Sequence, residues 1–152
     1  MKKYYLVLIC IFLVQLSFSQ IIIDKDGLYY DEDNELFTGS YVEFYDNGNK
    51  KIELDLIDGK KDGKVFLYFE NFKINEIRSY KEGLKHGLWE TWNENKIKTA
   101  EANFSNDLKH GKWIIWDNNG VKRCEMYYIE GKKSGTWYMW DENGKLIKQK
   151  EY

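Results

Sequence analysis

The sequence predicts an all-β fold, an elongated antiparallel meander of five stacked β-hairpins in a single solenoid-like sheet. Two observations support this prediction. Glycine recurs every 24 residues, at Gly39, Gly63, Gly87, Gly111 and Gly135, and the chain contains no proline. A fixed period of this size indicates a supersecondary unit copied end to end. Proline lacks the N–H that a strand ladder needs, so a chain of paired strands has little use for it.

The first nineteen residues precede the repeats and have the pattern of a secretory signal peptide. A basic start is followed by an apolar run from Tyr4 to Leu16 and by small residues at Ser17 and Ser19. This order of basic, apolar and small residues is typical of a cleaved export signal. We therefore expect a mature chain that starts at Gln20 and is periplasmic, on the outer surface or extracellular.

Residues 20–34 match the repeat columns poorly, and we interpret them as an N-terminal cap. Terminal units of repeat arrays are expected to differ from internal ones. The acidic run 31–35 lacks the spacing of a calcium-binding loop and is interpreted as a solvated part of the cap. The repeat domain then covers residues 35–152.

Each unit of the repeat domain has the pattern of a β-hairpin. A first strand rich in aromatic and branched residues follows the repeat glycine, as in residues 88–92 and 112–116. A second strand alternates apolar and polar residues, as in 122–128. Asparagine, often followed by glycine, separates the two strands and predicts a two-residue turn in which both residues have positive φ. Phe72 and Lys96 stand at the position of that turn glycine.

Tryptophan occupies two columns in these first strands. Trp89, Trp113 and Trp137 follow the repeat glycine by two residues, and Trp92, Trp116 and Trp140 follow it by five. Side chains three residues apart face opposite sides of a regular strand. Either both faces carry aromatic rings or a bulge rotates one column. The rings would form a packing ladder between repeats or an exposed row that binds a partner, and these six residues are the candidate binding row.

No other group of residues predicts chemistry, because each candidate belongs to a repeat column. His86 and His110 share a column one repeat apart, about 10 Å, which is too far for a shared zinc ion. Cys124 shares its column with Ile52 and Ala100, so we expect a buried small side chain. We predict no catalytic residue, no metal ion and no cofactor, and hence no enzyme.

The charged residues alternate along the chain without a basic block. Beyond the leader, 21 basic and 25 acidic residues leave a net charge of −4. Lysine recurs in one column, at Lys61, Lys85, Lys109 and Lys133. A phosphate-neutralising patch for nucleic acid is not expected from this pattern. We also expect no basic face that would bind a membrane.

The motif Gly-x-Trp-x-x-Trp-x-x-Asn-Gly, followed by a lysine-rich strand and Gly-x-Lys-x-Gly, resembles the MORN repeat. Its bacterial variant, found in YwqK-type antitoxins, is the most similar form. The similarity extends through residues 88–111, 112–135 and 136–152, and is looser in 40–63 and 64–87. It implies an elongated sheet with a scaffolding or binding role and no catalysis.

These observations predict a non-catalytic exported repeat protein that acts in protein–protein interaction or as a structural scaffold. Two alternatives stay open. The protein could be an antitoxin or immunity protein that masks a toxin along its sheet. It could also be a carbohydrate-binding or cell-envelope-binding module that uses the tryptophan row.

Overall fold

The computed structural model describes residues 22–23 and 27–152, and its regular elements are all β-strands. The predicted signal peptide lies outside the described residues. No helix with the length and hydrophobicity needed to span a bilayer occurs in the described part of the chain. The strands are β1 (Ile22–Ile23), β2 (Tyr29–Tyr30), β3 (Gly39–Phe44), β4 (Lys50–Ile57), β5 (Lys60–Tyr68), β6 (Ile74–Lys81), β7 (Leu84–Lys85), β8 (Gly87–Trp92), β9 (Lys98–Ser105), β10 (Leu108–Lys109), β11 (Gly111–Trp116), β12 (Lys122–Ile129), β13 (Lys132–Trp140) and β14 (Leu146–Glu151).

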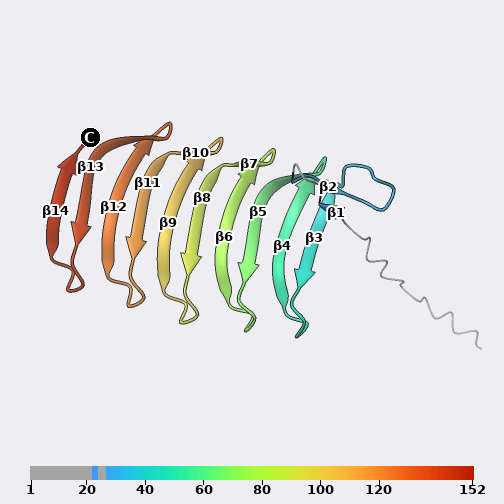
Figure 1. Cartoon of the computed structure of the whole chain (residues 1–152), viewed down its shortest axis with the longest axis horizontal. Helices are drawn as coiled ribbons and strands as arrows, with labels where there is room; N and C mark the ends of the chain where they lie inside the picture. Colours follow the sequence, from blue (N-terminus) through green and yellow to red (C-terminus); the bar gives the residue numbers. More distant parts are fainter. Residues whose placement is uncertain (1–21, 24–26) are drawn as a thin grey trace, which may run out of the picture.

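Ten long strands form one antiparallel sheet in chain order, from β3 at one end to β14 at the other (Figure 1). The short strands β7 and β10 pair with β6 and β9 at the margin of this sheet. Five hairpins, β3–β4, β5–β6, β8–β9, β11–β12 and β13–β14, stand side by side along the long axis. The predicted all-β meander of five hairpins is therefore confirmed.

The turns inside the hairpins differ from the prediction. In the first hairpin, Gly48 N–H donates to the Tyr45 carbonyl at 2.9 Å, and Tyr45 N–H donates to the Asn49 carbonyl at 2.8 Å. Among the loop residues, only Gly48 has positive φ, at 82°. This is a three-residue loop in which a type I turn precedes one left-handed residue. The predicted two-residue turn with two positive φ values is wrong here.

The left-handed residue of the loop is glycine in three hairpins, and Phe72 and Lys96 in the other two. Their φ values are 63° and 62°, which confirms that both stand where the turn favours glycine. Two-residue turns with two positive φ values occur instead between hairpins, as at Asp58–Gly59 (48° and 70°) and Glu130–Gly131 (47° and 80°). This backbone matches the right-handed twist of the flanking strands.

In four of the five hairpins the repeat glycine lies at a bulge near the start of the first strand, whereas β3 pairs regularly with β4 from Gly39 onward. In the last hairpin, Glu125 pairs with Tyr138, and Tyr127 pairs with Ser134. Between these two pairs β13 has three residues and β12 has one, so β13 carries two extra residues. Gly135, inside this bulge, has φ of 61°. A left-handed conformation at such a position is open to glycine at no steric cost. The bulge recurs in these four hairpins, which explains why glycine keeps the 24-residue period from Gly63 to Gly135.

The most deeply buried part of the sheet lies near its N-terminal end. Leu54 and Leu56 of β4 are fully buried and pack with Tyr29 and Val65. Tyr29 N–H donates to the Gly59 carbonyl at 3.0 Å, which ties the segment before the first hairpin to the β4–β5 turn. Elsewhere the sheet is one layer thick, so most aromatic side chains are half-buried.

Candidate functional site

The two tryptophan columns lie on opposite faces of the sheet. Between Trp89 and Thr91 the pairing of β8 with β9 is regular, and its register shifts only between Thr91 and Trp92. The extra residue at this bulge is Thr99 of β9, so β8 itself keeps its alternation from Trp89 to Trp92. We call the side that carries Trp89, Trp113 and Trp137 the ladder face, and the side that carries Trp92, Trp116 and Trp140 the ion-pair face.

The ladder face carries a continuous row of aromatic rings from β6 to the end of the chain. The indoles alternate with aromatic rings of the second strands, and the ring centroids lie 4.6–5.4 Å apart. Each indole N–H donates to a backbone carbonyl of the preceding hairpin, at 2.9–3.0 Å. The row consists of Tyr80, Trp89, Phe104, Trp113, Tyr128, Trp137 and Tyr152. These contacts join neighbouring repeats, so this tryptophan column packs as a ladder.

Lysine ammonium groups lie over the rings of this ladder at one position per repeat. Lys109 Nζ is 4.5 Å from the Trp113 centroid and 4.9 Å from that of Tyr128. Lys133 Nζ is 4.7 Å from the centroids of both Trp137 and Tyr152. Lys85 lies over Trp89 and Phe104, and Lys61 over Tyr29 and Tyr80. Each cation is attracted by the negative faces of two rings.

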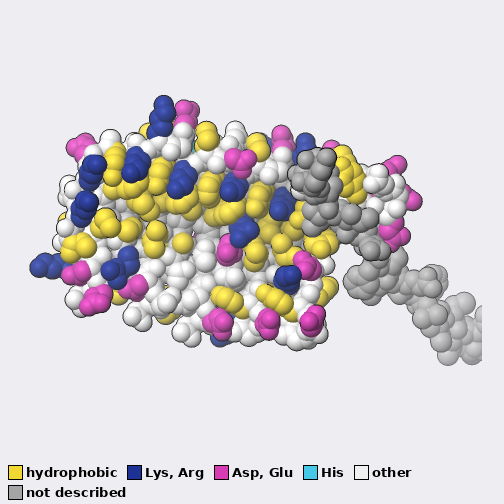
Figure 2. Space-filling view, viewed as in Figure 1, with side chains coloured by type: hydrophobic (Ala, Val, Ile, Leu, Met, Phe, Trp, Pro, Cys, Tyr) yellow, Lys and Arg dark blue, Asp and Glu magenta, His cyan; other side chains and the backbone are white. Residues whose placement is uncertain are grey.

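No ion pair joins Lys61, Lys85, Lys109 or Lys133 to a carboxylate among residues 27–152. Burial lowers the pKa of Lys61, and the nearby charge of Arg78 lowers it further. Figure 2 shows a hydrophobic band along the sheet with Lys and Arg side chains at regular intervals. The 24-residue period thus brings lysines that are dispersed in the sequence to one face of the sheet.

On the ion-pair face, by contrast, lysines are neutralised by glutamates. Lys98 Nζ lies between Glu90 and Glu101, and contacts the Glu101 carboxylate at 3.3 Å. Lys122 Nζ donates to Glu125 at 2.7 Å. This hydrogen bond is the main cause that lowers the pKa of Glu125. The second tryptophan column lies among these pairs, with Lys98 5.7 Å from the Trp92 centroid and Lys122 5.2 Å from that of Trp140.

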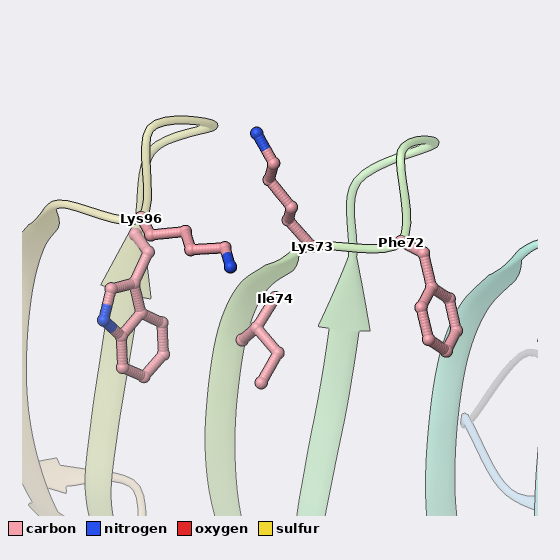
Figure 3. Close-up of a pocket in the computed structure, with 5 residues that line it drawn as sticks. Phe72, Lys73, Ile74 and Lys96 are labelled. Atoms are coloured by element: carbon pink, nitrogen blue, oxygen red, sulfur yellow. The ribbon is translucent and has the colours of Figure 1, made fainter.

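A hollow of about 450 Å³ on the ion-pair face lies between the turns of the second and third hairpins. It is lined by Phe72, Lys73, Ile74, Trp92 and Lys96. Figure 3 shows the Lys96 side chain reaching from its own hairpin toward Ile74 and Lys73. Ile74 begins β6, at the position where β9 and β12 begin with lysine. The missing lysine leaves an apolar surface that the sequence reasoning did not detect.

The remaining candidates of the sequence lie apart from one another. His86 Nδ1 is 3.2 Å from Asn106 Oδ1, and the backbone N–H groups of His86 and His110 donate to the preceding hairpins. In the described part of the chain, no three His, Cys, Asp or Glu side chains gather closely enough to hold a metal ion. Cys124, which we expected to be buried, is half-buried on the ladder face.

The family model described as the MORN repeat variant matches residues 109–130 and 133–152. These two segments are therefore similar to MORN repeats. They correspond to the fourth and fifth hairpins, from Lys109 at the end of β10 to the end of the chain. MORN repeats generally mediate interactions with proteins or membranes. No curated protein matches the chain.

Proposed function

We propose that this protein is an exported, non-catalytic interaction module whose ladder face binds an acidic segment of another protein. The observation that carries the proposal is the row of four lysines over the aromatic ladder. Their ammonium groups have no acidic partner among residues 27–152, whereas three lysines of the other face do.

The spacing of these lysines favours an extended partner. Equivalent positions of successive hairpins are two strands apart, which is about 10 Å in an antiparallel sheet. An acidic chain that crosses the strands could therefore place a carboxylate near each ammonium group in turn. The aromatic rings beside the lysines offer apolar contact area, and aromatic residues are enriched in binding hot spots.

The packing of the indoles favours a protein over a glycan as the partner. A glycan chain would stack on a flat row of ring faces. Here neighbouring rings of the ladder are inclined to one another by 49–64°. The indole N–H groups of Trp89, Trp113 and Trp137 already donate to the backbone, so they are not free for sugar hydroxyls.

The partner class includes a toxin held along the sheet, as the similarity to the antitoxin family suggests. Export through the leader would restrict such a toxin to one that acts outside the cytosol. A scaffold and an immunity protein would recognise their partners by the same chemistry, because a masked toxin would present its acidic surface to the same lysines. A scaffold and an immunity protein thus differ in the identity of the partner.

The test compares two variants of equal net charge. In the first, Lys61, Lys85, Lys109 and Lys133 are replaced by Gln. In the second, four lysines away from the ladder are replaced by Gln, namely Lys64, Lys112, Lys132 and Lys145. Each protein is immobilised and used to capture envelope proteins, and circular dichroism checks that both variants keep the β-sheet.

We expect the wild type and the second variant to retain the same acidic protein, and the first variant to lose it. Retention should also weaken as salt rises, because screening reduces the attraction between exposed charges. Equal capture by the two variants would contradict the proposal. If the wild type and both variants bind anionic lipid vesicles and none of them captures a protein, the proposal of a protein partner is wrong and a membrane is the partner.

A further inference from the structure

All sulfur-containing side chains beyond residues 1–21 gather at one place on the ladder face. The chain has three methionines and two cysteines, of which Met1 and Cys10 belong to the leader. The others, Cys124, Met126 and Met139, line the same hollow of about 190 Å³. Nothing in the 24-residue repeat requires sulfur at these positions, since the equivalent residues of other repeats include Ile, Leu and Ala.

The strand register brings these three side chains together. Cys124 of β12 and Met139 of β13 are direct cross-strand partners. Met126 follows Cys124 by two residues and therefore faces the same side. Directly opposed side chains have Cβ atoms about 4.5–5.5 Å apart, and diagonal neighbours are within reach of long side chains. Methionine has three rotatable bonds, so both thioethers can turn toward the cysteine.

We propose that Cys124, Met126 and Met139 form a binding site for Cu(I), a soft monovalent cation. Thiolate and thioether sulfur are the ligands that select Cu(I) over harder metal ions. On binding, the Cys124 thiol releases its proton to solvent, and the thiolate and the two thioethers each donate a lone pair to the ion. No electron is transferred. The hollow leaves the sulfurs accessible, as Cys124 and Met126 are half-buried and Met139 is exposed.

The charges around the hollow favour a monovalent ion. Lys148 and Lys150 of β14 also line it. One thiolate and one Cu(I) ion make a neutral unit, which these ammonium groups repel little. A divalent ion with the same ligands would keep one positive charge beside two lysines. The site is therefore expected to bind Cu(I) and Ag(I) and to exclude Zn(II).

Titration of the exported protein under anaerobic conditions tests this site. Cu(I) is supplied from a chromophoric chelator that competes for the ion, and Ag(I) serves as a second probe that does not change its oxidation state. We expect one ion per chain. Met126→Leu and Met139→Leu, which keep the side-chain volume, should each weaken binding by about tenfold or more. The methyl NMR signals of both methionines should shift on addition of Ag(I).

Ile115→Leu provides a matched control, because Ile115 pairs with Cys124 on the β11 side and has no sulfur. The affinity of the Ile115→Leu variant for Cu(I) should equal that of the wild type. Unchanged affinity in both methionine variants would overturn the proposal, because the cysteine alone would then account for binding. Loss of binding on replacement of His86 and His110 by Asn would overturn it as well. Circular dichroism of each variant verifies that the fold is retained.

Discussion

Lys96 holds a left-handed backbone conformation, with φ of 62°, at a turn position where three of the five hairpins carry glycine. A side chain in this conformation places its Cβ too close to the following carbonyl, at a cost of roughly 1–2 kcal/mol. Lys96→Gly removes this strain but adds the greater chain entropy of glycine in the unfolded state, roughly 0.5–1 kcal/mol. Because the lysine is exposed, little packing is lost. We expect a net stabilisation of about 1 kcal/mol or somewhat less.

The reverse substitution provides the matched control. Gly48 takes the same turn position in the first hairpin, with φ of 82°, and an added Cβ would meet no atom within 4 Å. Gly48→Ala therefore tests the backbone strain without steric contact, and should destabilise the protein by about 1 kcal/mol. Urea unfolding, followed by tryptophan fluorescence and circular dichroism, measures both changes. If Lys96→Gly lowers the free energy of unfolding, or Gly48→Ala leaves it unchanged, the turn assignment is refuted.

Phe72 occupies the same turn position but gains something from its side chain. Its ring stacks on Tyr68, with centroids 5.4 Å apart and an interplanar angle of 5°. Such a pair contributes about 0.5–1.5 kcal/mol beyond the burial of surface. Phe72→Gly should therefore change the stability by less than Lys96→Gly does. An equal stabilisation by the two substitutions would show that the stacked pair contributes nothing.

Three further results are expected. Trp113→Ala should lower the free energy of unfolding by about 2–4 kcal/mol in denaturant titration, since it removes the ring between two neighbours of the ladder; an unchanged stability would refute the packing role. The folded pKa of Glu125 is lowered below 4.5, so its pairing with Lys122 stabilises the fold above that pH and is lost as the pH falls through the folded value. Glu125→Gln should therefore reduce the loss of stability in acid, and an identical pH profile would contradict the shift. Mass spectrometry of the protein purified after expression of the full sequence in bacteria should find Gln20 at its N-terminus, whereas a retained leader would contradict the predicted signal peptide.

The architecture could be predicted because its cause is repeated. The bulge places a residue in a left-handed conformation that favours glycine in four of the five units, so the 24-residue period is visible in the sequence itself. The alternation of a regular strand predicted that the two tryptophan columns lie on opposite faces, and this was one of the two arrangements that the sequence allowed. Nothing in the sequence decided between them, because an extra residue in the first strand and one in its partner strand leave the same residue pattern. The pairing of β8 with β9 shows that the extra residue of the bulge is Thr99 of β9, between the partners of Thr91 and Trp92.

Other features depend on neighbours that only the folded sheet defines. An Asn-Gly pair suits both two-residue and three-residue loops, so the turn type was predicted wrongly. The lysine column was visible in the sequence, but the acidic residues close to it in the chain made its charge look balanced. In the folded sheet, none of these four lysines forms an ion pair with a carboxylate among residues 27–152. The gathering of Cys124, Met126 and Met139 comes from cross-strand register, which places β12 and β13 side by side.

The central claim is that the lysines of the ladder face contact a protein partner, and their chemical reactivity tests it most directly. The protein is acetylated with and without its captured partner, and mass spectrometry measures the modification of each lysine. We predict that the partner protects Lys61, Lys85, Lys109 and Lys133, while lysines away from the ladder such as Lys64 and Lys112 react equally in both states. Equal reactivity of the four ladder lysines with and without the partner would contradict the claim.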